Sequence, residues 1–145
     1  MPEQNEPLSA RKTMLLTGAS RGIGHATVKL FYQNGWRVLT VSRASFDADC
    51  PWPGGRESHI QADLSDPASY PAMADEVRKR LGGGGLSALV NNAAISQRSL
   101  CLETELDVYR RLFEVDVIGQ IALTKQVLPH MVSRGSGHVA VTASV

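Results

Sequence analysis

Short apolar runs recur along the chain at intervals that leave room for a helix or a long loop between them. Runs of about four to eight apolar or β-branched residues, bounded by polar or turn-forming residues, are typical of strands buried in a parallel sheet. Five such runs predict strands at residues 13–17, 36–41, 58–62, 86–91 and 138–142.

The segments between these runs carry helical spacing at three places. Helices are predicted at residues 23–34, with Gly35 as a left-handed C-terminal cap, at residues 66–81, with Asp66 or Ser69 as the N-cap and glycines 82–85 at the end, and as one or two helices within residues 106–134. Residues 44–55 hold two prolines and two glycines without a helical period, which predicts an irregular crossover. Strands that alternate with helices or long crossovers predict an α/β fold, with a parallel sheet covered on both faces.

Composition describes a globular chain without a strong charge. The 145 residues are 43% hydrophobic and carry a formal net charge of +1, which predicts one domain, at residues 13–145. Residues 1–12 contain two acidic residues and two prolines but no apolar core, which predicts a disordered leader. Acidic and basic residues are interspersed, so we expect neither nucleic acid nor a membrane as a partner. Cys50 and Cys101 show neither a disulfide framework nor metal-ligand spacing, which indicates lone thiols and a cytoplasmic protein.

The stretch TGASRGIG, residues 17–24, joins the first predicted strand to the first predicted helix. Glycines at this junction let backbone N–H groups approach a phosphate with no Cβ in the way, and a helix N-terminus adds roughly half a positive charge. The stretch therefore predicts a site for the pyrophosphate of a dinucleotide or for another adenosine-bearing cofactor.

A glycine-rich loop between a strand and a helix also occurs in other kinds of protein. Glycines also serve tight turns that bind nothing. The stretch lacks the Lys and the Ser or Thr of a P-loop, so a nucleotide triphosphatase is disfavoured. A methyltransferase with an adenosyl cofactor begins similarly but requires an acidic residue at the end of the second strand, where Ser42 and Arg43 stand.

Four motifs in order resemble the short-chain dehydrogenase/reductase family. TGASRGIG matches the glycine signature of that family, and ADLSD contains Asp63, at the position of an aspartate that contacts the adenine amino group. NNAAISQ, residues 91–97, matches the motif after the fourth strand, with Ala94 where glycine is usual, and GHVAVTASV matches the fifth strand. The resemblance covers residues 13–145 and implies a Rossmann-type doubly wound parallel sheet.

The resemblance also implies which residues bind the cofactor. They are Gly18, Ser20, Arg21, Gly22, Ile23 and Gly24 of the loop, with Arg43, Asp63, Leu64, Asn91 and Ala93. An acidic residue at the end of the second strand selects NAD through the ribose 2′-hydroxyl, whereas an arginine there pairs with the 2′-phosphate of NADP. Because Ser42 holds the acidic position and Arg43 follows it, we expect NADP, with NAD less favoured.

Catalysis in this family is implied to use a serine, a tyrosine, a lysine four residues after the tyrosine, and an asparagine. Ser144 matches the serine. Asp116 stands at the asparagine position, where an ionised carboxylate accepts hydrogen bonds but cannot donate one. None of the tyrosines, at positions 32, 70 and 109, is followed by lysine at the fourth position. We therefore expect the cofactor-binding half of such an enzyme, its sheet truncated after the fifth strand, with the tyrosine and lysine beyond residue 145.

Two function hypotheses from different classes follow. The first is an NADP(H)-dependent oxidoreductase that interconverts a small alcohol and a carbonyl compound. The second is a non-catalytic nucleotide-binding or oligomerising module. An apolar stripe within residues 106–134, which packs mostly on the sheet, corresponds to the helix through which the family commonly dimerises and predicts a homo-oligomer; its members are Leu112, Val115, Ile118, Ala122 and Val127.

Overall fold

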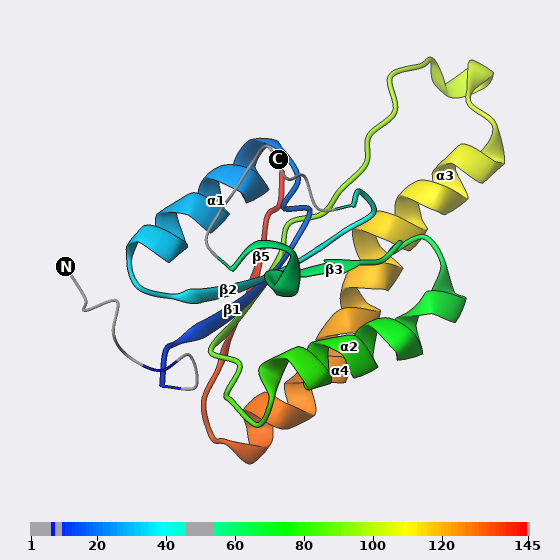
Figure 1. The fold of residues 1–145 in the computed structure, drawn as a ribbon. Helices are drawn as coiled ribbons and strands as arrows, with labels where there is room; N and C mark the ends of the chain where they lie inside the picture. Colours follow the sequence, from blue (N-terminus) through cyan, green and yellow to red (C-terminus); the bar gives the residue numbers. More distant parts are fainter. Residues whose placement is uncertain (1–6, 8–9, 46–53, 145) are drawn as a thin grey trace.

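The computed structural model describes residues 7, 10–45 and 54–144, which form an α/β fold on one parallel sheet (Figure 1). Five strands pair in the order β3-β2-β1-β4-β5. They are β1 (Thr13–Thr17), β2 (Arg37–Ser42), β3 (His59–Gln61), β4 (Ala88–Asn91) and β5 (His138–Val141). The predicted strands are confirmed, each with ends that differ by no more than two residues.

Helices cover both faces of this sheet. In Figure 1, α1 (Gly22–Gln33) lies on one face, and α2 (Tyr70–Leu81) and α4 (Gly119–Ser133) lie on the other. The chain leaves β1 toward β2 on one side and returns to β4 on the other, so the carboxyl ends of β1 and β4 flank the point where the strand order reverses. Crevices at such a point are where open α/β sheets bind ligands. The predicted doubly wound Rossmann-type sheet is confirmed.

Buried side chains of β1 alternate between two cores. Met14 and Leu16 pack with Val28 of α1, whereas Leu15 belongs to the larger cluster that includes Val77 of α2 and Leu123 of α4. Because both faces of the strand are covered, all five residues of β1 are buried. This explains why the run at residues 13–17 lacks polar alternation.

The helix ends follow the local sequence. Gly35 after α1 and Gly82 after α2 have φ values of +80° and +57°, the left-handed conformation that glycine adopts at least cost. Asp66 caps the short 3₁₀ turn η2 (Pro67–Ser69), where its carboxylate accepts the Ala68 N–H at 3.1 Å. Ser69 precedes α2 without a capping hydrogen bond from its side chain. Asp66, rather than Ser69, therefore provides the cap.

The segment predicted as one or two helices is continuous but contains a widened turn. α3 (Leu106–Phe113) passes through the π-helical turn η4 (Glu114–Ile118) into α4. Gly119 follows this turn, and a Cβ there would lie 2.6 Å from the Leu64 carbonyl oxygen. The missing side chain therefore lets α4 approach the loop that follows β3.

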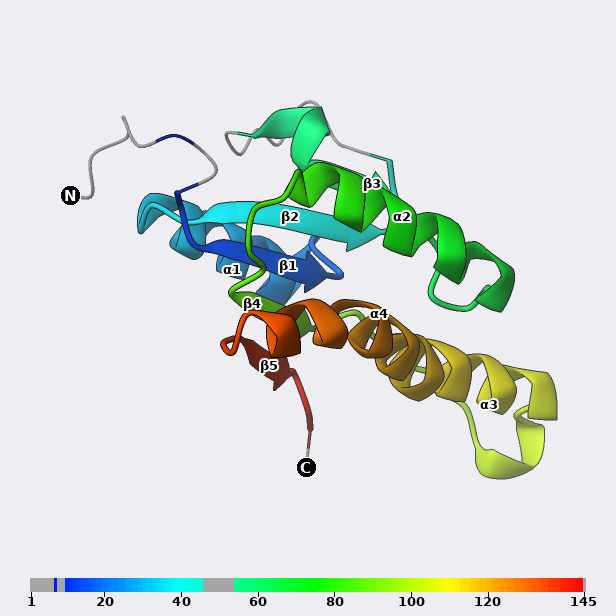
Figure 2. The same cartoon turned by 90° about the horizontal axis from the view of Figure 1, so that it is seen from below.

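Figures 1 and 2 show α3 and the loop before it, which contains the turn η3 (Cys101–Glu103), extending away from the sheet. Val115 and Val127 of the predicted stripe are buried against the sheet, whereas Ile118 is 46% exposed. A second apolar row faces outward along α3, η4 and α4; its members are Phe113, Val117, Ile121, Leu128 and Val132.

Some predictions lie outside the described residues. The predicted leader falls mostly on residues 1–6 and 8–9, and most of the predicted crossover, with Cys50, falls on residues 46–53. Cys101 is exposed and forms no disulfide. None of the described helices has both the length and the apolar character needed to cross a bilayer.

Candidate functional site

The glycine loop between β1 and α1 is held close to two neighbouring segments. The Gly18 N–H donates to the Val41 carbonyl at 2.8 Å, and a Cβ at Gly18 would lie 2.7 Å from Ala93 Cα. A Cβ at Gly24 would lie 2.2 Å from the Gly18 carbonyl oxygen. Gly22, with φ +59°, has no neighbour within 4 Å of such a Cβ. Gly18 and Gly24 thus allow close packing, whereas Gly22 supplies the turn and leaves open space.

The N-terminus of α1 opens at this loop without a cap from a side chain. Arg21 occupies the N-cap position in an extended conformation, and its side chain makes no capping hydrogen bond. The first turn of the helix contains no acidic residue. Its leading N–H groups therefore have neither a capping side chain nor an acidic side chain of their own turn, the condition under which a helix N-terminus binds an anion.

A cavity of about 630 Å³ lies in front of this N-terminus, at the carboxyl edge of the sheet. We name it the carboxyl-edge cavity. Its volume falls within the range of roughly 300–1,000 Å³ usual for small-molecule sites. The predicted cofactor residues that line it are Gly18, Ser20, Arg21, Gly22, Ile23, Arg43, Asp63, Leu64 and Ala93. Gly24 and Asn91 do not line it.

Asp63 presents an ionised carboxylate beside the cavity. Its Oδ1 accepts hydrogen bonds from the Ser65 N–H at 2.9 Å and from the Ser65 hydroxyl at 2.7 Å. Burial acts to raise the pKa of Asp63, but these two hydrogen bonds and the charges of Arg43 and Arg111 together hold it below its ordinary value. The carboxylate is therefore charged at neutral pH. Both hydrogen bonds from Ser65 go to Oδ1, so Ser65 leaves Oδ2 as a hydrogen-bond acceptor.

The end of β2 and the glycine loop each bring one cationic residue to the same cavity. Ser42 is buried, and its hydroxyl donates to the Ala44 carbonyl at 3.1 Å. Arg43 follows it and lines the cavity together with Arg21 from the glycine loop. Two guanidinium groups and an uncharged serine thus line this part of the cavity.

A network of hydrogen bonds joins the glycine loop to the segment after β4. The Thr17 hydroxyl oxygen accepts the N–H groups of Asn92 and Ala93 at 3.0 and 2.9 Å. The Asn92 amide donates to the carbonyls of Thr17 and Gly18 at 3.2 and 3.3 Å, and its oxygen accepts the Thr142 hydroxyl at 3.0 Å. The ends of β1, β4 and β5 are therefore joined by hydrogen bonds at the wall of the cavity.

Sequence reasoning missed this network. It assigned a binding role to Asn91 rather than to Asn92, although both stand in the quoted motif. Asn91 is buried; its amide donates to the Thr124 hydroxyl at 3.0 Å, while its own oxygen has no hydrogen bond. Alternation along β4 could have separated them, because consecutive strand residues face opposite sides. Thr17 gave a signal too, since a polar residue closes an otherwise apolar run.

Asp116 lies on η4 and points to the segment after β4. Its Oδ1 accepts the Ile95 N–H at 2.9 Å. Gln120, four residues later on the same helical face, donates to the Ala93 carbonyl at 2.8 Å. The turn η4 and the first turn of α4 thus each present one polar side chain to the same loop. Val115, which precedes Asp116, lines the carboxyl-edge cavity.

Ser144 lies just after β5. It is exposed and is not among the residues that line the carboxyl-edge cavity, whereas Thr142, two residues earlier, does line it. Within residues 7, 10–45 and 54–144, no three His, Cys, Asp or Glu side chains gather as metal ligands. The geometry is that of an anion- and nucleotide-sized cleft at the reversal point of a parallel sheet.

Comparison with known proteins agrees with this geometry. The sequence profile described as short chain dehydrogenase matches residues 12–145. The chain belongs to the short-chain dehydrogenase family. It is 42% identical over 139 residues to Protein FixR of Bradyrhizobium diazoefficiens, covering 91% of this chain and 50% of that protein. It is 34% identical to human dehydrogenase/reductase SDR family member 7, and the match covers 90% of this chain and 40% of that protein. The chain thus spans about half the length of the curated relatives it matches.

Solved structures of the family share the fold with similar TM-scores. An oxidoreductase from Brucella ovis, in complex with a partially ordered NAD, is 45% identical with a TM-score of 0.80, over 89% of this chain and 61% of that one. A candidate NAD(P)-dependent gluconate 5-dehydrogenase from Beutenbergia cavernae, with bound NADP at low occupancy, is 27% identical with a TM-score of 0.79, over 97% and 57%. The family is thus one of oxidoreductases whose members bind a nicotinamide cofactor.

Ala94 departs from the glycine usual at that place in short-chain dehydrogenases. The described residues include no non-glycine residue with a positive φ, so Ala94 needs no left-handed backbone. It lines the carboxyl-edge cavity. The replacement therefore adds a methyl group to the wall without straining the chain.

Proposed function

We propose that the protein containing these residues is an NADP(H)-dependent oxidoreductase that interconverts a small alcohol and a carbonyl compound. The observation that carries the proposal is the uncapped N-terminus of α1, which opens on a cavity lined by Asp63 and two arginines. An uncapped helix N-terminus favours a pyrophosphate, and a charged carboxylate beside it favours a hydrogen-bond donor such as an adenine amino group.

The residues present fit a dinucleotide. Gly22 places no side chain in the open space in front of α1, so the loop backbone faces the cavity there, while Gly18 and Gly24 let the loop pack closely on its neighbours. Gly22 and the first turn of α1 would hold the pyrophosphate, and Asp63 would accept from the adenine. When bound, the cofactor supplies or accepts the hydride. Thr17 and Asn92 then act as positioning residues, since they hold the loop to the strands behind it.

The proposed choice of NADP rests on Arg43 and Arg21. Both line the cavity, and Ser42 holds the position at which a carboxylate would select NAD. A guanidinium pairs with a phosphate through charge-assisted, frequently bidentate hydrogen bonds. The NAD in the Brucella ovis relative makes NAD the competing choice.

Titration of NADPH and NADH tests this choice. We expect NADPH to bind about ten- to a hundredfold more tightly, because a charge-assisted contact contributes about 1.5–3 kcal/mol. Arg43→Gln should remove most of that difference, whereas Arg98→Gln, which alters an exposed arginine outside the cavity, should leave it intact. Equal affinities for the two nucleotides in the unaltered protein would refute the choice.

The catalytic part of the proposal assigns roles to two residues. Ser144 donates a hydrogen bond to the substrate oxygen, and Asp116 fixes the loop after β4 through the Ile95 N–H. The tyrosine and lysine that move the proton are proposed to stand outside residues 1–145, where no tyrosine has a lysine at the fourth following position. General acid–base catalysis contributes about 10² to 10⁴ in rate. Residues 1–145 alone are therefore expected to reduce carbonyl compounds only at the background rate.

A second candidate is a non-catalytic nucleotide-binding or oligomerising module. Under both candidate functions, we propose a cytoplasmic homo-oligomer. The outward apolar row on α3, η4 and α4 favours it, because exposed apolar rows favour association. NADPH oxidation with a panel of carbonyl compounds separates the candidates. Turnover that depends on Ser144 supports the oxidoreductase, and tight nucleotide binding without turnover in the whole protein supports the module.

A further inference from the structure

A second cavity, of about 620 Å³, lies at the opposite edge of the sheet. We name it the amino-edge cavity. Its walls include Val38 near the start of β2, Tyr32 at the end of α1 and Ser58 of the turn η1 (Gly55–Ser58). Within the described residues β2 pairs with β3 only from Thr40 onward, so the first half of β2 has no strand on this side. The cavity therefore occupies an open part of the sheet edge, remote from the glycine loop.

The described walls of this cavity are strongly cationic. They carry Arg11, Arg37, Arg56, Lys79 and Arg80, against one carboxylate, that of Glu57. Like charges gathered around one cavity repel each other, and a bound counter-anion relieves that repulsion. The rest of the chain is nearly neutral, with a formal net charge of +1. This concentration of charge is thus a local feature of the amino-edge cavity.

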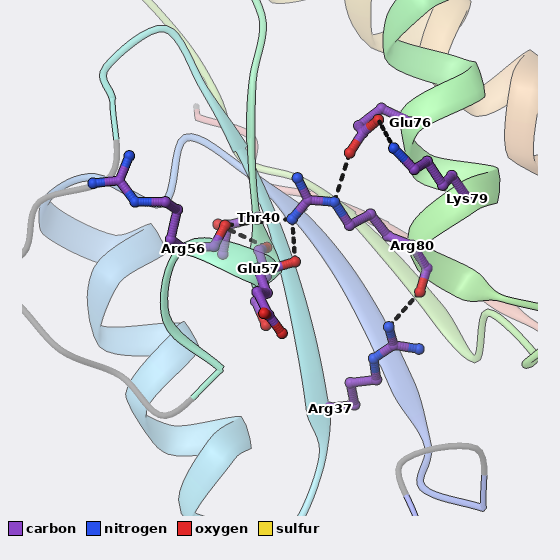
Figure 3. A network of polar contacts seen from close by, with 8 residues as sticks. Arg37, Thr40, Arg56, Glu57, Glu76, Lys79 and Arg80 are labelled. Atoms are coloured by element: carbon purple, nitrogen blue, oxygen red, sulfur yellow. Dashed lines mark hydrogen bonds and ion pairs between the residues drawn. The ribbon is translucent and has the colours of Figure 1, made fainter.

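Hydrogen bonds fix two of the guanidinium groups. In Figure 3, Arg37 donates from Nη2 to the Arg80 carbonyl at the end of α2. Arg80 donates from Nε to Glu76 Oε1 at 2.7 Å and from Nη1 to the backbone carbonyls of Arg56 and Glu57. Each guanidinium has five N–H donors, so both keep donors beyond these bonds. Their orientation is therefore set before any ligand binds.

Only part of this positive charge is neutralised. Glu76 pairs with Arg80, and also with Lys79 at 3.8 Å. Among the residues that the structure describes, no carboxylate forms an ion pair with Arg37 or Arg56. Burial lowers the pKa of Arg37, with no carboxylate acting to raise it. An anion in the cavity would provide this missing partner.

The placement of the charges indicates the shape of that anion. In Figure 3 the side chain of Arg56 extends away from Arg37 and Arg80, so the three guanidinium groups do not converge on one point. Half-buried Tyr32 and Trp36 add aromatic surface to the wall. A ligand with separated anionic groups and an organic part matches this arrangement better than a single phosphate ion does.

We propose that the amino-edge cavity binds a small phosphorylated organic molecule with at least two anionic groups. Arg37 and Arg80 hold one group in their fixed donor arrays, and Arg56 and Lys79, which lie on opposite sides of Arg80 in Figure 3, contact further anionic groups at the rim. Guanidinium groups suit this chemistry because their planar fork matches phosphate oxygens. The site is separate from the carboxyl-edge cavity, so both can be occupied together.

Calorimetric titration with pyrophosphate and with inorganic phosphate tests the proposal. No dinucleotide is added, because its own phosphate groups would compete with the probe at both cavities; pyrophosphate bound at the glycine loop is recognised because it persists in the variant described next. The double variant Arg56→Gln/Lys79→Gln removes two charges whose side chains make no hydrogen bond to the backbone in the described structure. We expect pyrophosphate to bind at least about tenfold more weakly to this variant. The control Lys29→Gln/Arg98→Gln removes the same charge from exposed residues that line neither cavity, and should bind as the unaltered protein does.

Three results would overturn the proposal. They are the absence of pyrophosphate binding, equal loss in the control variant, and inorganic phosphate binding as tightly as pyrophosphate. Failure of the proposed oxidoreductase function is distinguishable, because it would appear as a loss of dinucleotide binding or turnover. Pyrophosphate binding that depends on Arg56 and Lys79 would support the amino-edge site in either case.

Discussion

The cavities at the two edges of the sheet have nearly the same volume, about 630 Å³ at the carboxyl edge and about 620 Å³ at the amino edge, but different walls. The carboxyl-edge cavity is built around backbone: a glycine loop and an uncapped helix N-terminus. The amino-edge cavity is built from long cationic side chains. Backbone donors give the first site its shape, whereas the second depends on side chains, of which Arg37 and Arg80 are held by hydrogen bonds.

Helix α2 runs between these two regions. Near its start, the Tyr70 hydroxyl donates to the Leu64 carbonyl at 2.6 Å, beside the carboxyl-edge cavity. Near its end, the Arg80 carbonyl accepts from Arg37 beside the amino-edge cavity. The first contact is buried and the second is partly exposed. Substitutions at the carboxyl edge should therefore affect folding more strongly than those at the amino edge.

The largest effect is expected from Gly24→Ala. The added Cβ would meet the Gly18 carbonyl oxygen at 2.2 Å, and backbone cannot move aside as a flexible side chain does. We expect a loss of about 3 kcal/mol or more in the free energy of unfolding, and roughly a hundredfold weaker dinucleotide binding in the molecules that remain folded. Urea unfolding and nucleotide titration measure the two effects.

Gly22→Ala is the matched control for this substitution. Gly22 has φ +59° but no neighbour within 4 Å of an added Cβ, so only the backbone conformation is penalised, by about 1 kcal/mol. The close approach of α1 to the glycine loop would not be required at the carboxyl edge if Gly24→Ala left the free energy of unfolding unchanged. The same conclusion would follow if the two substitutions lowered this free energy equally.

The two cavities also differ in how far the sequence predicts them. The carboxyl-edge cavity follows from a short segment, because the strand, the glycines and the helix that form it are adjacent in the chain. Arg37, Arg56 and Arg80 come from segments far apart, and each alone resembles a solvated surface residue. The doubly wound parallel sheet and the cap at Asp66 could be predicted from the sequence, and alternation along β4 could have separated Asn92 from Asn91. The π-helical turn η4, in contrast, depends on packing between distant elements.

The second prediction concerns the contact at the start of α2. Tyr70→Phe removes a hydroxyl that donates to the Leu64 carbonyl and lies 3.0 Å from Glu114 Oε1. We expect a loss of about 1–2 kcal/mol, because a buried carbonyl loses its partner. Tyr109→Phe, at a half-buried tyrosine on α3, is the comparison and should cost less. If Tyr70→Phe and Tyr109→Phe lowered the free energy of unfolding in urea equally, the buried hydrogen bond of Tyr70 would contribute no more than an ordinary contact.

The same tyrosine gives a pH dependence. Burial, followed by the hydrogen bond and charge of Glu114, raises the pKa of Tyr70 to about 12. An unfolded tyrosine loses its proton near pH 10, so the unfolded state binds fewer protons above that pH and stability falls as pH rises from about 10 to 12. The fall should be shallower in Tyr70→Phe. A fall of equal slope in both proteins would contradict the assignment.

The smallest effect is expected at Asp63, and it has the opposite pH dependence. Hydrogen bonds from Ser65 and the nearby arginines hold the pKa of Asp63 below its ordinary value of about 3.9 despite the opposing effect of burial. The contribution of this carboxylate to stability is therefore present above about pH 4 and is lost as pH falls below it. Asp63→Asn should cost about 1 kcal/mol at pH 7 and almost nothing once the carboxyl is protonated.

Unfolding curves measured at neutral pH and near pH 3 test whether the stabilities of Asp63→Asn and the unaltered protein become equal at low pH. Asp107→Asn provides the control, because Asp107 is an exposed residue whose ion pair with Arg110 lies far outside the cavity. If the Asp63→Asn deficit persisted unchanged at low pH, the lost contact would be one of packing rather than charge. The carboxyl edge would then lack the ionised group that, in our proposal, binds the adenine and distinguishes its cavity from the cationic one at the amino edge.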